Sequence, residues 1–424
     1  MRANAYLVMA LAVVLVAGSA TKAVAQTSDD LFNDQKLQRI DIFVHSKDWA
    51  LLKATFDENT HYPADVRWGG QAARNASIRS RGSGSRSATK PGLLIDFGHY
   101  VSGQTFLGLQ KLVLKNLTQD PSTVREFLAM KLLRRMGIAA PREAYAVLYV
   151  NNAYSGLYGI VENIDSVATQ RILGEGTGYL YEYNWLSYYY FTYPGTDLQA
   201  YAGMYKPVTH ESESPSALYG TFEAWTRTVN DVADQDFIGA VQAYLDLVPF
   251  IRLTAAQAYL SELDDFLGSW AMNNFFIYRF SGKSVHQLIA WDEDHALWFV
   301  DYPVTVGHNE NVLMRRIMAS PGWSSAYLAT VLEAADVANQ VDEAAPGQGW
   351  LEAEASRVIA MVRDAVYADP YKPYSNDEFE LDAARALSFT QQRGPFVRCE
   401  VARLTGGRPP NQPCSVPVGV RSIR

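Results

Sequence analysis

Residues 273–299, NNFFIYRFSGKSVHQLIAWDEDHALWF, decide the fold and the chemistry of this chain. The segment predicts two strands joined by a turn that contains Gly282, with acidic residues after the second strand. Three of these acids, Asp292, Glu293 and Asp294, stand between two tryptophans in an otherwise apolar run. Charges are rarely placed in such a run unless they are paired or bind a ligand. The segment therefore predicts a β-hairpin that presents carboxylates for a specific purpose.

Two acids and an asparagine upstream of the acidic run complete a donor set suited to phosphoryl transfer. In such sites one Asp accepts the proton of the substrate hydroxyl, while an Asn and a second Asp hold Mg²⁺ on the phosphates. Asp264 or Asp265 suits the proton-accepting role. Asn274 suits the amide ligand, and Asp292, helped by Asp294, suits the acidic ligand. Magnesium prefers hard oxygen donors of these types.

A purely structural role for the same residues is also open. Asp and Asn are common helix caps and turn residues. On a strand, Asp292 and Asp294 would share one face, where two like charges repel unless a cation lies between them. Arg315 or Arg316 in VLMRRI, residues 312–317, could supply that cation without any catalytic function.

A basic stretch rich in glycine and serine, RSRGSGSRSATK at residues 79–90, follows a predicted strand. Small residues allow backbone N–H groups to approach phosphates, and Arg79, Arg81, Arg86 and Lys90 add positive charge. The stretch matches neither a Walker loop nor the glycine-rich loop of ordinary protein kinases. A phosphate-binding loop and a solvated basic loop are both consistent with it.

The N-terminus predicts a cleaved secretory signal. Arg2 precedes the apolar run LVMALAVVLVAG, and the small-residue motif AVA ends at Ala25. Loss of residues 1–25 removes Arg2 and Lys22, which changes the formal net charge from −8 to −10. No later segment is long and apolar enough to cross a membrane. An acidic exported chain is a poor candidate for binding nucleic acid.

The chain has 2 cysteines, Cys399 and Cys414, on either side of a turn rich in glycine and proline. In an oxidising compartment an even pair of this kind predicts a disulfide. A metal site is disfavoured because no histidine lies near the two thiols.

The hydrophobic pattern divides the chain into a sheet-rich part followed by a helix-rich part. In the first part, Asp120 is expected to cap a helix with Pro121 at its first position and Gly137 after its last turn. The turn Asn151–Asn152 predicts a hairpin, although its loop could be longer than two residues. The expected organisation is a signal (1–25), a polar leader (26–36), a sheet-rich N-lobe (37–165), an aromatic-rich insertion (166–214), a helix-rich C-lobe (215–395) and a tail with the disulfide (396–424).

Several segments in one order resemble the CotH kinase family, the spore-coat protein H group of atypical protein kinases. They are IRSRGSGS with Lys90 before LLIDF, KLVLKNLTQDPSTVREFLAMKLLRRMGI, VLYVNNAYSGLYGIVENID, NNFFIYR and IAWDEDHALW. The resemblance implies an α+β fold, a divergent bilobal protein-kinase-like fold with a sheet-rich N-lobe and a helical C-lobe. It also implies use of ATP with Mg²⁺ or Mn²⁺ and phosphorylation of Ser or Thr hydroxyls on a protein substrate.

Carried over by position, the resemblance implies roles for individual residues. Asp292 matches the metal-binding Asp, and Asn274 the family's Asn. Lys90 matches the lysine of the first lobe, which implies a phosphate contact. Arg81, in the same basic stretch, is expected to bind the nucleotide as well. Glu162 matches an acid near the lobe connection, without the lysine-pairing role of ordinary kinases. The catalytic Asp should lie just before Asn274, which leaves Asp264 or Asp265.

One departure from the family pattern concerns DDFLGSWAMNN, residues 264–274, where the spacing between the catalytic Asp and the Asn is longer than usual. An inactive kinase-like surface module that binds a protein or a glycan through the aromatic segment 178–195 is therefore the alternative function. A hydrolase with two metal ions is disfavoured, because only His286 and His295 lie near the acids. The expected protein is an exported monomer without a membrane-spanning segment.

Overall fold

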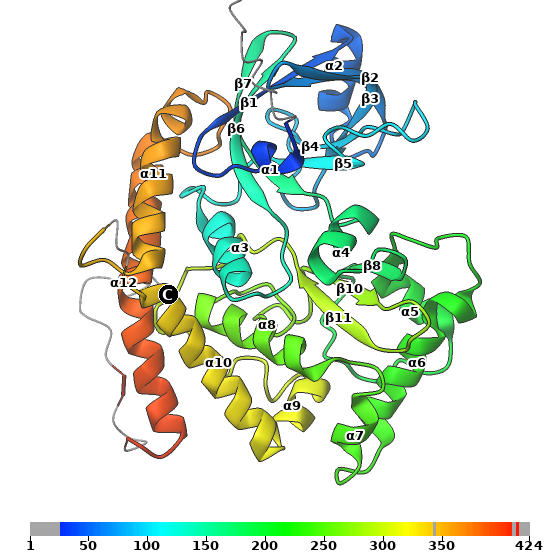
Figure 1. The fold of residues 1–424 in the computed structure, drawn as a ribbon, viewed down its shortest axis with the longest axis vertical. Coiled ribbons are helices and arrows are strands. Elements are labelled where there is room, and N and C mark those ends of the chain that lie inside the picture. The colour runs from blue at the N-terminus through cyan, green and yellow to red at the C-terminus, as the bar shows by residue number, and fades with distance from the viewer. Residues whose placement is uncertain (1–25, 342–344, 409–412, 415–424) are drawn as a thin grey trace, which may run out of the picture.

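The computed structural model describes residues 26–341, 345–408 and 413–414 of the chain. The expected signal, residues 1–25, lies outside the described residues. The described chain is a mixed α+β structure, as expected from the sequence. A β-barrel forms one end of the molecule, at the top of Figure 1, and helices with a smaller sheet form the other end.

The barrel contains seven strands in the order β1-β2-β3-β4-β5-β7-β6. Its pairs are antiparallel except that β1 pairs in parallel with β6, which closes the sheet on itself. The sequence predicts these strands as a mixed sheet, but closure into a barrel is not apparent from the local pattern. The strands are β1 (Gln38–Val44), β2 (Tyr62–Trp68), β3 (Gln71–Arg81), β4 (Gly92–Asp96), β5 (Lys111–Lys115), β6 (Glu143–Val150) and β7 (Ala153–Glu162).

The hairpin between β6 and β7 has a two-residue turn. Asn151 and Asn152 adopt φ angles of 50° and 67°, and Val150 pairs with Ala153. Asparagine tolerates this left-handed backbone, which suits the twist of a tight hairpin. The predicted hairpin is therefore confirmed with its shortest loop.

The helix expected after Asp120 begins later than predicted, because α3 spans Arg125–Arg135 and residues 121–123 form a turn. Asp120 still acts on the helix terminus. One of its carboxylate oxygens accepts from the backbone N–H of Arg125 at 3.0 Å, and the other accepts from the backbone N–H of Ser122 at 2.9 Å. Gly137 follows the helix with φ 72°, as expected for a C-terminal glycine.

A second sheet of four strands lies beside the helices, in the order β11-β10-β8-β9. The predicted hairpin is confirmed, since β10 and β11 pair antiparallel from Phe275–Ala290 to Arg279–His286. The strands are β8 (Tyr179–Tyr183), β9 (Tyr205–Pro207), β10 (Phe275–Arg279) and β11 (His286–Ala290). The remaining helices are α1 (Ser28–Leu31), α2 (Ser46–Ala54), α4 (Ser166–Leu173), α5 (Leu198–Met204), α6 (Pro215–Asp231), α7 (Phe237–Val241), α8 (Leu247–Leu260), α9 (Val312–Met318), α10 (Pro321–Asn339), α11 (Trp350–Ala368) and α12 (Asn376–Leu404).

A small apolar cluster joins the barrel to the second sheet. Val113 of β5 and Val161 of β7 pack together with Leu180 of β8, Ile289 of β11 and Trp291, and all five are buried. Because Trp291 directly follows β11, this packing brings the residues after that strand to the end of β5. The cluster thus positions the acidic run against the barrel.

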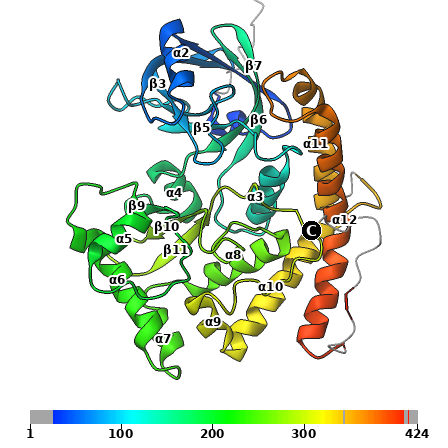
Figure 2. The same ribbon diagram turned by 180° about the vertical axis from the view of Figure 1, so that it is seen from behind.

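The helices α11 and α12 run from the barrel to the far end of the molecule, on the left of Figure 1 and on the right of the reverse view in Figure 2. Asp369, just after α11, accepts from the backbone N–H of Leu157 on β7 at 3.0 Å and pairs with Lys90 at 2.7 Å. The fully buried Arg393 of α12 donates to four backbone carbonyls, including those of Tyr259 at 2.8 Å and Val300 at 2.7 Å. These helices therefore tie the barrel to the helical part.

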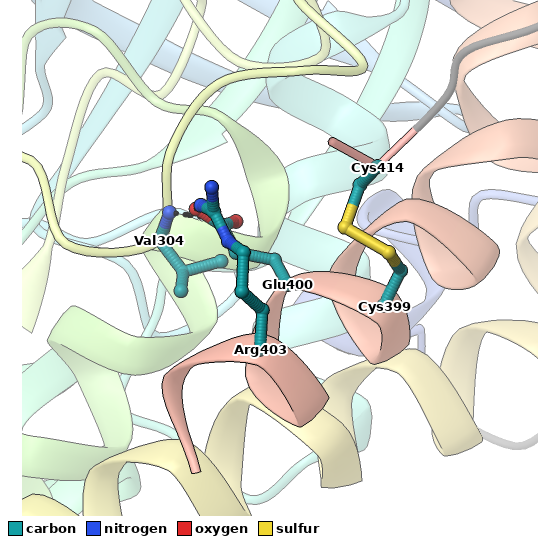
Figure 3. Close-up of a disulfide and its surroundings, with 5 residues drawn as sticks. All are labelled: Val304, Cys399, Glu400, Arg403 and Cys414. Carbon is teal, nitrogen blue, oxygen red and sulfur yellow. Dashed lines mark hydrogen bonds and ion pairs between the residues drawn. A yellow bond between two sulfur atoms is a disulfide. The ribbon is translucent and has the colours of Figure 1, made fainter. Parts of the chain in front are cut away.

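The predicted disulfide is confirmed. Cys399 in α12 bonds to Cys414, with 5.8 Å between their Cα atoms (Figure 3). Next to it, the buried Glu400 accepts from the backbone N–H of Val304 at 3.2 Å. The hydrogen bond attaches the end of α12 to the loop before α9, and the crosslink holds Cys414 against the same end of the helix. Over the described residues, none of the helices has the length and apolar character that crossing a bilayer requires.

Candidate active site

A lysine on the last position of β5 is the centre of the candidate site. Lys115 Nζ donates to a carboxylate oxygen of Glu126, in the first turn of α3, and to one of Asp292, after β11. Burial favours the neutral amine, but Asp292 and Glu126, with smaller contributions from Asp294 and Glu143, raise the pKa of Lys115 well above its usual value. Lys115 is therefore a permanent cation that links three elements of the fold.

Burial also opposes ionisation of Asp292, but the nearby Lys115 and Arg81 outweigh it and lower the pKa of this carboxyl. Asp292 does not lie on a strand as expected, since β11 ends at Ala290. It adopts φ 60°, in the left-handed region, which turns the chain sharply at this point. Its partner is Lys115, and neither Arg315 nor Arg316 has the structural role considered from the sequence.

The other two acids of the run point to different partners. Glu293 is buried and accepts from the side-chain amide of Gln257 at 2.7 Å. Asp294 lies 3.7 Å from Nε2 of His295 and lines the same pocket as Asp292. Burial, and then the charge of Asp292, raise the pKa of Asp294 well above its usual range. The three acids thus serve one ion pair, one buried hydrogen bond and one pocket wall.

The two tryptophans that flank the run also differ. The ring of Trp291 lies under two cations, with Arg81 4.8 Å and Lys115 5.5 Å from its centroid. Trp298 instead packs under Arg125, at 3.9 Å, and Arg125 is fully buried. Trp291 therefore supports the two cations of the candidate site, whereas Trp298 belongs to the structural support of α3.

A second group of polar residues comes from the loop between α8 and β10. Asp264 accepts from the side-chain amide of Asn273 at 3.0 and 3.1 Å and from that of Asn274 at 2.9 Å. The amide of Asn274 also donates to the backbone carbonyl of Asp292 at 3.5 Å. Burial, and to a smaller extent the charge of Asp292, raise the pKa of Asp264 to about 6. A general base works best when its pKa lies near the working pH, and a carboxyl with this pKa is suited to that role close to neutral pH.

The two adjacent aspartates differ in their surroundings. Asp265 is 3% exposed and accepts from the backbone N–H of Leu267 at 2.9 Å, which is a turn-forming contact. Burial raises the pKa of Asp265 to about 7. Asp264 contacts Asn274, which in turn contacts the backbone of Asp292, whereas Asp265 holds the loop.

The structure does not bring Lys90 or Glu162 into this group. Lys90 is 2% exposed, and its ammonium pairs with Asp369 rather than lining the pocket. Glu162 pairs with Arg171 and Arg142, which outweigh the effect of burial and lower its pKa. Both residues are partners in structural ion pairs, with a distant helix end for Lys90 and with neighbouring segments for Glu162.

The pocket that holds Lys115 lies between the barrel, α3 and the acidic run. The loop after β3 covers one side of it, because the amide of Asn116 donates to the carbonyls of Ser85 at 2.7 Å and Lys90 at 2.8 Å. Besides Lys115 and Asp292, the pocket is lined by apolar residues of β5, β6 and β7 and by polar residues of the loops, including Arg81, Val113, Glu126, Glu143, Ala144, Val161 and Asp294. It combines an apolar wall with a cationic and acidic end, a usual property of small-molecule sites.

A family model described as CotH kinase protein matches residues 78–397, which is more than half of the chain. The chain belongs to the CotH kinase family. No curated protein matches the sequence. A crystal structure of a Helicobacter pylori proinflammatory kinase, CtkA, aligns with 77% of this chain and 95% of that chain at 7% sequence identity. Its TM-score is 0.29, which is too low to establish a shared fold.

Membership of the CotH kinase family implies ATP and a divalent metal ion in general terms. Within the described ranges, no three His, Cys, Asp or Glu side chains gather closely enough to hold a metal ion. Asn274 uses its amide nitrogen in both of its hydrogen bonds, so its amide oxygen accepts none from the described residues. Mg²⁺ commonly takes one or two protein ligands and fills its shell with phosphates and water. Asp292 and Asn274 fit a cation held in that way.

In this CotH kinase the sequence interpretation missed two residues, Lys115 and Glu126, that the structure places with Asp292. Lys115 ends the apolar strand KLVLK, and Glu126 stands in the first turn of the next helix, eleven positions later. A cation at the end of a buried strand, followed by an acid in a helix that packs on it, is the signal that could have identified the pair. The basic loop was more conspicuous, but its Lys90 is buried against Asp369.

Proposed function

We propose that this protein is an exported protein kinase that transfers the γ-phosphate of ATP to Ser or Thr hydroxyls of a protein substrate. The observation that carries the proposal is the contact of Lys115 with both Glu126 and Asp292 at the closed end of the pocket. An ion pair between a strand lysine and a helix glutamate, next to a metal-binding Asp, is the arrangement that active protein kinases require. The barrel would then act as the N-lobe and the helical part as the C-lobe.

The residues of the pocket and of the loop between α8 and β10 suit separate roles in the transfer. Lys115 and Arg81 would contact the phosphates, because both cations face the pocket beside Trp291. Asp292 and Asn274, with Asp294 nearby, would hold the divalent cation. A bound Mg²⁺ or Mn²⁺ would neutralise charge on the phosphates and align them. Lys115 neutralises Asp292 in this structure, so nucleotide and metal would have to take over both partners of this ion pair.

Asp264 is the proposed proton acceptor. The acceptor hydroxyl oxygen forms a bond to the γ-phosphorus while the bond from that phosphorus to the β–γ bridging oxygen breaks, and the hydroxyl proton passes to Asp264. Asn273 and Asn274 orient this carboxylate through three hydrogen bonds. Asp265 would position the loop and not touch the substrate, because its carboxylate is buried on backbone N–H groups.

Export is proposed from the signal-like N-terminus, and the Cys399–Cys414 disulfide agrees with an oxidising compartment. We further propose that the chain acts as a monomer on a separate protein. The described residues supply every group assigned above from one chain.

The direct test is phosphate transfer from labelled ATP by the purified mature chain with Mg²⁺ or Mn²⁺. We expect Lys115→Met and Asp264→Asn to lower transfer by at least about a hundredfold, because each removes a group that acts on the transition state. Lys111→Met is the matched control, since Lys111 lies at the other end of the same strand and is exposed next to Asp96. Equal activity in the parent and the Lys115 variant would refute the assignment.

The alternative, an inactive module that binds a protein or glycan, predicts a different set of results. The parent would transfer no phosphate, and Mg²⁺ with ATP would not raise its melting temperature. A ligand that binds the folded state at one hundred times its dissociation constant stabilises it by about 2.7 kcal/mol, so nucleotide binding is readily detected in this way.

A further inference from the structure

A buried glutamine of α8 contacts the acidic run, and none of the roles assigned above uses it. Gln257 lies in the last turn of α8, which ends at Leu260. Its side-chain amide donates to the carboxylate of Glu293 at 2.7 Å, and both side chains are 1% exposed. Removal of either side chain would leave a polar partner without this contact and away from water, so the pair is strongly constrained.

Glu293 stands between two acids that line the pocket. Asp292 and Asp294 line the pocket, whereas the carboxylate of Glu293 contacts α8. The strand pairing of β11 ends at Ala290, and the chain turns sharply at Asp292, where φ is 60°. The hydrogen bond from Gln257 therefore holds the direct neighbour of the proposed metal ligand at a point that the sheet does not reach.

Two further contacts join the residues after the acidic run to the same end of α8. The backbone N–H of Leu297 donates to the carbonyl of Leu260 at 2.8 Å. The backbone N–H of Phe299 donates to the hydroxyl of Ser261 at 3.3 Å. The acidic run and the residues that follow it are thus attached along the last turn of α8.

The loop with the proposed base begins at this helix end as well. Glu262 is 2% exposed, and its carboxylate accepts from the backbone N–H of Asp264 at 3.0 Å. Asp264 contacts Asn274, which contacts the backbone of Asp292. The end of α8 therefore supports both the proposed base and the proposed metal ligand, and a shift of the acidic run on α8 would change the distance between them.

The contact of Asp292 with Lys115 does not remove the need for this support. Lys115 holds the side chain of Asp292 in this structure. In the proposed reaction, nucleotide and metal take over both partners of that ion pair. The place of Asp292 then depends on its backbone, which the adjacent Glu293 attaches to α8.

We propose that Gln257 is a positioning residue of this CotH kinase: through Glu293 it holds Asp292 where a divalent cation meets the phosphates. The inference rests on the proposed function for the identity of the metal ligand. Outer partners that orient metal ligands typically change metal affinity or activity by about 10–100-fold when they are mutated. Gln257 acts through the backbone next to the ligand, so we expect an effect near the lower value.

The test is titration of the full mature chain with a fluorescent ATP analogue, in the presence and absence of Mg²⁺. The quantity compared is the gain in affinity for the analogue that Mg²⁺ causes. We expect Gln257→Leu to reduce this gain by about tenfold. Glu293→Gln should retain most of the gain, because glutamine keeps a side-chain oxygen that accepts from Gln257.

Gln38→Leu is the matched control. Gln38 is a buried glutamine of β1, in the barrel, and its side chain makes three hydrogen bonds. The same substitution there should lower the midpoint of urea unfolding and leave the Mg²⁺-dependent gain unchanged.

A double variant separates positioning from stability. Gln257→Leu combined with Glu293→Leu places two apolar side chains against each other, so no polar group of the pair is left without a partner. Its urea midpoint should lie above that of Gln257→Leu, while its Mg²⁺-dependent gain should stay as low as in that single variant, because an apolar contact lacks the direction of a hydrogen bond. Recovery of both quantities together would assign Gln257 to stability alone and overturn the inference.

Equal gains in the parent and in Gln257→Leu, or equal losses in Gln257→Leu and Gln38→Leu, would also overturn it. A parent whose affinity for the analogue does not depend on Mg²⁺ would do the same. Mg²⁺-dependent binding without phosphate transfer from ATP would instead contradict the proposed kinase function and leave the positioning role of Gln257 standing.

Discussion

Replacement of Lys90 by methionine separates the two lysines that the sequence and the structure favour for the phosphate contact. Lys90 lies in the basic loop, where its position in the family pattern suggests a nucleotide contact. The structure buries its ammonium against Asp369 instead, with both side chains 2% exposed. We therefore expect Lys90→Met to reduce stability and to leave nucleotide affinity unchanged in the fraction that is folded.

The magnitude follows from what the variant leaves behind. Removal of one partner of a buried ion pair costs about 3–5 kcal/mol, because the remaining charge has no counter-charge. Asp369 keeps two backbone hydrogen bonds, from Leu157 at 3.0 Å and Tyr371 at 2.9 Å. These bonds place the expected loss near the lower value, about 3 kcal/mol. Adding Asp369→Asn removes the stranded charge, but the amide NH2 group then faces the backbone N–H of Leu157 or Tyr371, so the double variant should regain only about 1 kcal/mol of that loss.

The assay is urea unfolding followed by circular dichroism, combined with titration of a fluorescent ATP analogue and Mg²⁺. Lys115→Met serves as the opposite case, with lost nucleotide affinity. A Lys90→Met protein as stable as the parent but unable to bind the analogue would refute the placement of Lys90. A double variant less stable than the single one would refute the ion-pair energetics.

Three further predictions concern the ionisable groups and the disulfide. In Lys115→Met the carboxyls around position 115 lose their counter-charge, and their pKa values rise. The variant should therefore be less stable than Lys111→Met by a margin that grows from pH 5 to pH 8, as thermal unfolding at several pH values would show. A margin independent of pH would contradict this charge balance. The kcat/KM for phosphate transfer should rise as pH increases through about 6, because burial raises the pKa of Asp264 to that value and only the ionised form accepts a proton. A pH profile without this rise would exclude Asp264 as the base. The double change Cys399→Ser with Cys414→Ser should reduce the free energy of unfolding by about 3 kcal/mol, since the crosslink closes a loop between residues 15 positions apart. Reduction of the disulfide in the parent should cause the same loss.

Local elements of the fold were predictable because their signals are local. The two-residue turn at Asn151–Asn152 and the hairpin from Phe275 to Ala290 follow from turn chemistry and alternation, and both are confirmed. The start of α3 was misplaced, because Asp120 and Pro121 resemble a helix start but form a preceding turn. Closure of the barrel depends on the parallel pairing of β1 with β6, which are far apart in sequence, and no local pattern encodes it.

In the candidate site, too, residues with a local signal could be predicted, whereas residues paired across distant segments could not. Asp292 was selected from its unusual place in an apolar run, and Asp264 and Asn274 from the donor set and the family resemblance. The structure brings these three residues together. Lys115 was not found, since a lysine at the end of a strand is ordinary until a helix glutamate packs on it. Lys90 was selected for its conspicuous loop, but its partner Asp369 comes from a distant helix end that the sequence does not connect with it.

The pairing of Lys90 with Asp369 also sets an order of events during synthesis. Residue 369 is near the end of a chain of 424 residues, so a barrel that has already left the ribosome waits for most of the protein before this partner arrives. Until then a buried cation and the N–H of Leu157 have no acceptor from this helix end. A nascent barrel is thus kept short of its native stability until the segment after α11 has been made.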